Sequence, residues 1–280
     1  VFGLIRGTMS VLYTGGLWVS GTDIRSTLGG LQQIKPTCIV AVPGICEVIM
    51  GLVKMYGKDF LGGRLRFIIA GAANVAPKLI AEFDSIGISL FAGYGMTEGG
   101  NLTSGNVDVK DKPTSVGKIY PCQEVKVVDG ELWIRGDNVF LGYYGDPEKT
   151  AETLSEDGWL KTGDLVRFDE DGYMYITGRI KNLIVLSNGE NVSPESLEEP
   201  FYKCDRLRDC LVKEEDGVIA IEILPRMEEF ADTSWEDVEK YFSVLLAEIN
   251  STLPTTHRIA KLTVRKEDFK RTGTMKVSRI

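Results

Sequence analysis

Two short apolar segments that end in glycine, joined by one predicted helix, constrain the fold of this chain most. FIIAG covers residues 67–71, SLFAG covers residues 89–93, and NVAPKLIAEFDSIG lies between them. We expect Asn74 to be the N-cap of that helix and Gly87 its C-cap. Buried strands joined by a helix pair in parallel, and ligands bind beyond their carboxyl ends. The sequence therefore predicts an α/β fold with a site after these strands.

A second helix is predicted from Pro43 to Gly57. Proline is favoured in the first turn of a helix, where its missing N–H costs nothing. The apolar residues that follow have helical spacing and should form the buried face: Ile45, Val48, Ile49, Leu52 and Val53.

The pattern changes to β-hairpins from about residue 116. EVKVV and ELWIR flank Asp129-Gly130, and LVRFDE and YMYIT flank Asp171-Gly172. Asp-Gly between alternating apolar residues is a strong hairpin signal. We expect a small antiparallel, barrel-like β subdomain here.

The rest of the chain, from about residue 182, is typical of a separate α+β module. It is predicted to begin with a tight turn at Ser187-Asn188-Gly189, followed by a helix that is capped by Ser193-Pro194 and runs through Cys204. A hairpin around Asp216-Gly217 follows. The last helix is opened by the capping box Thr233-x-x-Glu236 and ends near Thr252. The buried stripe of that last helix should be Val238, Phe242, Leu245, Leu246 and Ile249. We expect domain limits of 1–115, 116–180 and 181–280.

The composition excludes several classes of protein. The 280 residues carry a net charge of −8, with a pI near 5.0, which argues against a general nucleic-acid or anionic-membrane surface. No apolar run is long enough for a transmembrane segment. The five cysteines show no C-x-x-C spacing, which favours reduced thiols and a cytoplasmic location. With His257 as the single histidine, a histidine metal site or a Ser-His-Asp triad is disfavoured.

GYGMTEGG, residues 93–100, follows the second predicted strand and resembles a nucleotide-binding glycine loop. The dinucleotide pattern G-x-G-x-x-G fails because Glu98 stands at its third glycine. No G-x-x-x-x-G-K-[ST] phosphate loop occurs in the chain. A carboxylate beside phosphates is tolerable only with a cation between them. The segment is therefore either an ordinary tight turn or a phosphate site that works through a metal.

Five segments are informative through their order and spacing along the chain. They are GYGMTE, GELWIRGDNVFLGYY at 130–144, GWLKTGD at 158–164, GRIKNLIVLSNGENVSPE at 178–195, and KRTGTMKVSR at 270–279. Together they resemble the adenylate-forming (AMP-binding) superfamily, and most of all its fatty-acid-type acyl-CoA synthetases. The resemblance implies activation of a carboxylic acid substrate by ATP to an acyl-adenylate and pyrophosphate. Coenzyme A, or alternatively a carrier protein, then accepts the acyl group, and Mg²⁺ is the metal cofactor.

The resemblance also implies a fold class, namely the C-terminal part of a large adenylating domain followed by a small α+β domain. The large domain is expected to contribute a parallel-sheet α/β subdomain and a small β-barrel. Its nucleotide-binding residues would be Gly71, Ala72, Ala73, Gly93, Tyr94, Gly95, Met96, Thr97, Asp164, Arg179 and Lys276.

Particular roles follow for some of these residues. Tyr94 would stack on adenine, Thr97 would donate to a phosphate oxygen, and Glu98 would bind Mg²⁺. Asp164 would accept hydrogen bonds from the ribose hydroxyls. In isolation these residues have plainer interpretations: a core tyrosine, a solvated loop carboxylate and an exposed aspartate at a strand start.

By the same resemblance, the small domain would rotate about a hinge and would bind the acyl acceptor. Lys181 stands at the family's interdomain hinge, and Asn188 and Gly189 would line the pantetheine tunnel. Lys276, in the basic tail, is the expected catalytic cation, together with Thr97 and Glu98. Met275 stands where the family has a glycine, while Arg271, Thr272 and Arg279 fit the pattern.

One expected segment is missing from the sequence. The family's Ser/Thr/Gly-rich phosphate loop ends in Pro-Lys-Gly, and no segment matches it; SGTDIRST at 20–27 lacks that ending. The chain also begins with valine inside an apolar element. We therefore expect a C-terminal portion of an acyl-CoA ligase that is impaired alone. A non-catalytic, truncated nucleotide-binding homologue is the alternative.

Overall fold

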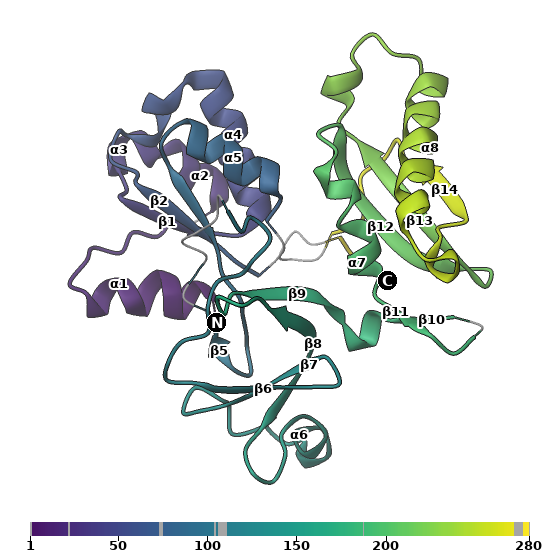
Figure 1. The fold of residues 1–280 in the computed structure, drawn as a ribbon. Helices are drawn as coiled ribbons and strands as arrows, with labels where there is room; N and C mark the ends of the chain where they lie inside the picture. Colours follow the sequence, from purple (N-terminus) through teal and green to yellow (C-terminus); the bar gives the residue numbers. More distant parts are fainter. Residues whose placement is uncertain are drawn as a thin grey trace. The chain divides into compact units, whose positions relative to one another are not determined.

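The computed structural model describes residues 2–21, 23–72, 75–103, 105, 111–186, 188–271 and 277–279. The chain forms two compact units. The first unit comprises Val1–Thr162 with Val166–Ile176, and the second comprises Gly163–Leu165 with Thr177–Ile280. Each unit combines helices with β-sheet (Figure 1).

A parallel sheet organises the N-terminal part of the first unit. It has the order β1-β2-β3, with β1 at Cys38–Ala41, β2 at Phe67–Ala70 and β3 at Ser89–Ala92. Both neighbouring pairs are parallel, so that Ala41, Ala70 and Ala92 lie at the same edge. The two predicted strands and their parallel pairing are confirmed.

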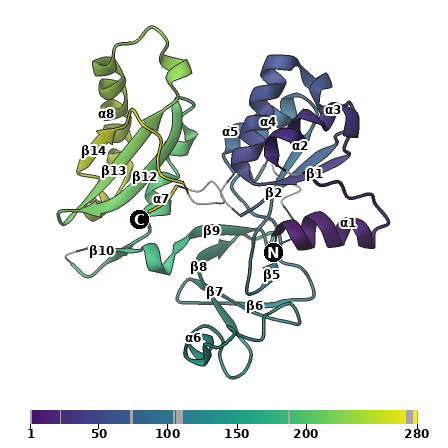
Figure 2. The same cartoon turned by 180° about the vertical axis from the view of Figure 1, so that it is seen from behind.

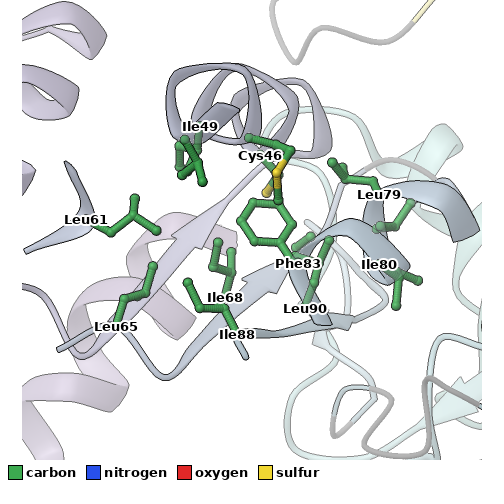
Figure 3. Packing of buried hydrophobic residues seen from close by; sticks show 14 of the residues in the cluster. Cys46, Ile49, Leu61, Leu65, Ile68, Leu79, Ile80, Phe83, Ile88 and Leu90 are labelled. Carbon is green, nitrogen blue, oxygen red and sulfur yellow. The ribbon is translucent and has the colours of Figure 1, made fainter. Parts of the chain in front are cut away.

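Helices α4 (Pro43–Tyr56) and α5 (Pro77–Ser85) pack against this sheet. Figure 3 shows their inward side chains meeting those of the strands, with Phe83 next to Cys46 and above Ile68 and Leu90. These four side chains are completely buried. Burial of an aliphatic or aromatic side chain contributes about 1.5–3 kcal/mol, so this cluster is a main source of the unit's stability.

Three details of these helices differ from expectation. Asn74 lies outside the described residues, and it is not the N-cap of α5, because the helix begins at Pro77 with Ala76 in the cap position. The C-cap of α5 is Ile86 rather than Gly87, which follows it with φ +72, a conformation suited to glycine after a helix end. In α4, Ile49 and Val53 are buried as expected, but the buried face is rotated toward Cys46 and Met50, while Val48 is 46% exposed.

Short helical turns complete the rest of this layer. They are η1 (Gly3–Met9), α1 (Ser10–Tyr13), α2 (Ile24–Gly29), α3 (Leu31–Ile34) and η2 (Lys58–Leu61). Asp23 caps α2 by accepting a hydrogen bond from the Ser26 amide. Leu28, Leu31 and Leu61 join the core of the sheet and its helices.

The β subdomain contains a sheet of order β6-β7-β8-β9, in which β8 and β9 contribute residues to both units. Its strands are β6 (Glu124–Val128), β7 (Glu131–Arg135), β8 (Leu160–Phe168) and β9 (Met174–Arg179), and α6 (Pro147–Thr153) follows the β7 region. Asp129 and Gly130 both have positive φ, as the predicted tight turn between β6 and β7 requires. Bridges from Thr103 to Ile119 and from Gly117 to Met174 extend the pairing.

The second unit is built on the sheet β12-β13-β14, formed by Leu207–Glu215, Val218–Pro225 and Lys261–Val264. Helix α8 (Trp235–Thr252) packs on this sheet, as Figures 1 and 2 show from opposite sides. The predicted hairpin at Asp216-Gly217 is confirmed, with β12 antiparallel to β13. Val238, Phe242 and Ile249 are buried on α8, and Leu245 and Leu246 are partly buried beside them.

Two helix ends in this unit were predicted wrongly. Helix α7 (Pro194–Glu198) is capped by Ser193 as expected, but it ends well before Cys204. Pro200 explains the early end, since it has no backbone N–H to donate to the carbonyl of Ser196 and so cannot continue the helical hydrogen bonds. The N-cap of α8 is Ser234, which accepts a hydrogen bond from the Asp237 amide, rather than Thr233.

Among the described residues, no helix is both long and apolar enough to cross a lipid bilayer.

Candidate nucleotide-binding site

The first predicted site residues lie at the carboxyl edge of the parallel sheet. Gly71 follows β2 and donates its amide to Ala41 O at 3.3 Å; Gly93 follows β3 and donates to Ala70 O at 2.9 Å. A Cβ on Gly71 would come within 2.9 Å of the Phe2 ring, so a larger residue here would displace the Phe2 side chain. Ala72 has φ +69, an uncommon value for a residue with a side chain. Ala73 lies outside the described residues.

GYGMTE forms a small hairpin rather than the start of a helix. β4 (Gly95–Met96) pairs antiparallel with β5 (Gly100–Asn101). Tyr94 is half-buried; its amide donates to Thr103 Oγ1 at 2.9 Å, and its carbonyl accepts from the Leu102 amide at 2.9 Å. This geometry excludes a dinucleotide fingerprint, whose glycine loop opens a helix.

Thr97 and Glu98 lie at the tip of this hairpin. Thr97 is exposed and Glu98 is half-buried. The Glu98 carbonyl accepts from the Phe140 amide at 2.7 Å, and its carboxylate Oε1 accepts from the Tyr143 hydroxyl at 2.8 Å. Burial, followed by the Glu98 carboxylate, raises the pKa of Tyr143, which keeps the phenol protonated and able to donate. Tyr143 had no predicted role, although it lies inside the GELWIRGDNVFLGYY motif.

Glu98 fits a nucleotide-bound Mg²⁺ better than a metal cage. Within the ranges that the structure describes, no three His, Cys, Asp or Glu side chains converge on one point. Mg²⁺ in nucleotide sites is held by one or two carboxylates, with phosphate oxygens and waters as the other ligands. A single half-buried carboxylate at the hairpin tip matches that donor set.

A broad hollow of about 550 Å³ lies nearby in the same unit. One loop and the start of α6 line it: residues 141–147, Thr150 and Ala151. None of the predicted nucleotide-binding residues belongs to this lining, so the hollow is not the predicted site.

Asp164 and Arg179, both in the second unit, form an ion pair. Arg179 Nε contacts Asp164 Oδ1, and Arg179 Nη2 lies 3.3 Å from Asp164 Oδ2. Asp164 is only 4% exposed, so the interpretation as an exposed strand-start aspartate is wrong. The carboxylate is oriented by a guanidinium, a bidentate geometry that fixes its plane.

The predicted hinge and acceptor residues are on the surface of the second unit. Lys181 is exposed in the turn Ile180–Asn182, directly after β9. β10 (Ile184–Val185) and β11 (Asn191–Val192) confirm the hairpin, where Asn188 is exposed and Gly189 has φ +81. Ser187 lies outside the described residues.

Glu190 connects this hairpin to the short turn Thr255–His257, which follows α8. His257 Nε2 and Glu190 Oε1 are 2.8 Å apart, and this contact lowers the pKa of Glu190. The single histidine of the chain thus has a structural partner in the second unit.

Lys276, the expected catalytic cation, lies with Thr272 and Met275 outside the described residues. The residues on either side of it are anchored. Arg271 pairs with Val277 in an antiparallel bridge, and Arg271 Nη2 lies 3.0 Å from Asp209 Oδ2. Arg279 donates to both carboxylate oxygens of Glu198, at 2.9 and 2.8 Å. Sequence reasoning found these arginines but not their partners.

Comparison with known protein families assigns most of the chain. The AMP-binding enzyme family model matches residues 1–144, and the model of the AMP-binding enzyme C-terminal domain matches residues 181–280. The chain belongs to the AMP-binding enzyme family. The resemblance stated from its motifs is confirmed.

Several curated relatives are named as acyl-CoA ligases. "4-coumarate--CoA ligase-like 6" of Arabidopsis thaliana is 32% identical over 273 residues, covering 88% of this chain and 47% of that protein. "Fatty acyl-CoA synthetase A" of Dictyostelium discoideum is 41% identical over 172 residues, covering 54% and 25%. "Long chain acyl-CoA synthetase 6, peroxisomal" of Arabidopsis thaliana is 37% identical over 172 residues, covering 55% and 24%. The matches span half or less of these relatives' lengths.

Solved structures share the fold. The anthranilate CoA ligase AuaEII in complex with anthranoyl-AMP has a TM-score of 0.79 at 22% identity, covering 99% of this chain and 55% of that one. The amide bond synthetase McbA from Marinactinospora thermotolerans has a TM-score of 0.78 at 23% identity, covering 96% and 56%. The α/β fold is that of the C-terminal part of an adenylating enzyme, as expected.

Proposed function

We propose that this chain supplies the nucleotide-binding and acceptor-binding parts of an ATP-dependent acid–thiol ligase. The observation that carries this proposal is the GYGMTE hairpin beyond the carboxyl edge of the parallel sheet, with Glu98 at its tip. Open α/β sheets bind ligands at that edge. The family membership and the names of the relatives support the same conclusion.

In the first half-reaction, an oxygen of the substrate carboxylate attacks the α-phosphorus of ATP. A new P–O bond forms to the acyl group, and the bond between the α- and β-phosphates breaks to release pyrophosphate. Two anions must approach each other, so the site has to supply donors and cations. Thr97 donates its hydroxyl to a phosphate oxygen, and Glu98 holds Mg²⁺, which neutralises phosphate charge when it is bound.

The family resemblance assigns the remaining nucleotide contacts to further residues. Tyr94, with Gly71, Ala72, Ala73, Gly93, Gly95 and Met96, lines the adenine side of the site. Asp164 accepts hydrogen bonds from the ribose hydroxyls, and Arg179, which orients it, adds positive charge near the ribose or phosphates. Lys276 is the cation that bridges the substrate carboxylate and the α-phosphate as charge builds up.

In the second half-reaction, the thiol of coenzyme A attacks the acyl carbonyl carbon and AMP leaves. The exposed turn at Asn188 and Gly189 lines the pantetheine path, because glycine allows a ligand to approach the backbone closely. Lys181 is the hinge between the adenylating and thioester-forming arrangements. The domain limits of 1–115, 116–180 and 181–280 belong to this proposal. Coenzyme A is proposed rather than a carrier protein.

The acid is proposed to be a fatty acid of medium or long chain. Relatives named as long-chain and medium-chain fatty acyl-CoA ligases support this choice. A relative named as a 4-coumarate ligase-like protein makes aromatic acids the necessary comparison in any assay.

The test is ATP–pyrophosphate exchange by the protein as its gene encodes it, with a panel of fatty and aromatic acids. Lys276→Ala should lower exchange by about a hundredfold, the typical cost of removing one transition-state donor. Lys270→Ala, an exposed lysine of the same basic tail, is the matched control and should leave exchange near the wild-type rate. If wild type supports exchange with none of the acids in the panel, the enzyme proposal is overturned and a non-catalytic nucleotide-binding protein is favoured. Equal exchange by Lys276→Ala and wild type would remove only the role of Lys276.

A further inference from the structure

The Glu98 hairpin is held by a segment far along the chain. The residues around Tyr143 contact it through both backbone and side chain. The Phe140 amide donates to Glu98 O at 2.7 Å, Asn138 Nδ2 donates to Gly99 O at 2.5 Å, and the Tyr143 hydroxyl donates to Glu98 Oε1 at 2.8 Å. The hairpin tip is therefore fixed to residues 138–143 by three hydrogen bonds.

Tyr143 is itself held on several sides. Its amide donates to Thr150 Oγ1 at 2.9 Å, which ties it to α6. Its ring makes an edge-on contact with Phe140, with centroids 4.9 Å apart, and Lys149 Nζ lies 4.7 Å from the ring centre. A tyrosine with this many contacts presents its hydroxyl in one direction, so it can orient a partner.

We infer that Tyr143 is a positioning residue for the metal: it orients the Glu98 carboxylate so that the second oxygen is presented to a nucleotide-bound divalent cation. The inference rests on the proposed function, because it assigns the metal to Glu98. The phenol occupies one carboxylate oxygen and restricts rotation of the side chain. Hydrogen-bond partners of metal ligands act in this way, and their loss commonly weakens metal binding 10- to 100-fold.

The chain offers a matched pair of variants. Tyr143→Phe removes the hydroxyl but keeps the ring that packs on Phe140. Tyr144→Phe makes the same chemical change one residue later, on a side chain that is fully exposed. Both changes remove a single oxygen atom from the same loop, so a difference between them reports the contact with Glu98.

The experiment measures Mn²⁺ binding by electron paramagnetic resonance, with an ATP analogue that has a methylene group between its α- and β-phosphorus atoms. Mn²⁺ replaces Mg²⁺ as the probe, and the analogue prevents turnover. Tyr143→Phe should raise the Mn²⁺ dissociation constant about tenfold. Its affinity for the analogue in EDTA and its melting temperature should stay at the values of Tyr144→Phe, since a merely structural defect would change them.

Glu98→Gln separates the failure of this inference from failure of the proposed function. If Glu98→Gln abolishes Mn²⁺ binding and Tyr143→Phe binds as tightly as wild type, the positioning role is overturned and Glu98 remains the ligand. If folded wild type binds no Mn²⁺ with the analogue, the proposed metal site is wrong and the inference fails with it. If Glu98→Gln retains weak Mn²⁺ binding, adding Tyr143→Phe to it should not weaken binding further, because Tyr143 acts through Glu98.

Discussion

At the scale of single residues, buried charges in this protein receive guanidinium partners from distant parts of the sequence. Asp164 is paired with Arg179, and Glu198, only 6% exposed, is paired with Arg279. Glu198 also accepts a hydrogen bond from the Val212 amide at 2.7 Å. Burial of a charge without such partners would cost several kcal/mol, so these contacts decide which acidic residues the fold can tolerate inside.

The buried carboxyl of Glu198 predicts how stability depends on pH. Burial outweighs Arg279 and raises the pKa of Glu198 from 4.5 to about 7. The folded protein therefore binds this proton more tightly than the unfolded chain does. The contribution of protonated Glu198 to the free energy of unfolding is complete below about pH 4.5 and is lost as the pH rises through about 7.

We expect the free energy of unfolding of wild type to fall by about 1–3 kcal/mol from this group between pH 5 and pH 8. Glu198→Gln, which cannot ionise, should lack that part of the slope. Urea unfolding followed by fluorescence of the tryptophans, which include Trp235 in the second unit, gives both curves. Parallel curves for wild type and variant would show that Glu198 does not titrate in this range.

At the scale of elements, close backbone approach shapes the GYGMTE hairpin. A Cβ on Gly95 would lie 2.3 Å from the Gly100 carbonyl oxygen in the paired strand. A Cβ added to Gly51, in the interior of α4, would have no atom within 4 Å outside its own helix turn and chain neighbours. The two glycines therefore have opposite physical consequences, although the sequence alone marks both only as glycine.

Alanine at these two positions should have effects of opposite sign. Gly95→Ala should destabilise the protein by about 1–3 kcal/mol, because the hairpin must shift to relieve the clash. Gly51→Ala should stabilise it by about 0.5–1 kcal/mol, because alanine loses less backbone entropy in a helix. Chemical denaturation measures both. A neutral Gly95→Ala variant would contradict the close approach of β4 and β5.

At the scale of the whole molecule, the chain is organised as two compact units whose boundary runs close to Thr177. The matched C-terminal family domain begins at Lys181, which is exposed in the turn after β9. The strand β9 belongs to the sheet before this turn, and β10 follows it. Lys181 thus lies where a change in backbone angles would disturb neither sheet.

A proline at Lys181 tests whether the protein needs that freedom. Proline fixes φ near −65° and restricts the residue before it. Lys181→Pro should slow thioester formation from supplied acyl-adenylate by about tenfold or more, while adenylation stays within about twofold of wild type. Lys181→Ala is the control and should affect neither step strongly. Equal effects of proline on both half-reactions would contradict a hinge at this residue.

Much of the architecture could be predicted because its signals are local. Asp129-Gly130 and Asp216-Gly217 form turns because both residues of each pair adopt positive φ, a requirement set within two residues. The short apolar runs of β2 and β3, each ending in glycine, likewise predicted buried strands from a few adjacent residues. Helix ends were less predictable: α8 begins after Ser234 rather than Thr233, since both residues could cap and their surroundings selected one.

The sequence by itself determined the strands β2 and β3, the tight turns at Asp129-Gly130 and Asp216-Gly217, and the motifs that place the chain in its family. Only the tertiary structure decided which side chains meet. Tyr143 bonds Glu98 across 45 positions, and Arg279 bonds Glu198 across 81. The rotated buried face of α4, with Cys46 inside and Val48 outside, was decided in the same way. Such contacts depend on how the chain returns on itself in space, which no local pattern encodes.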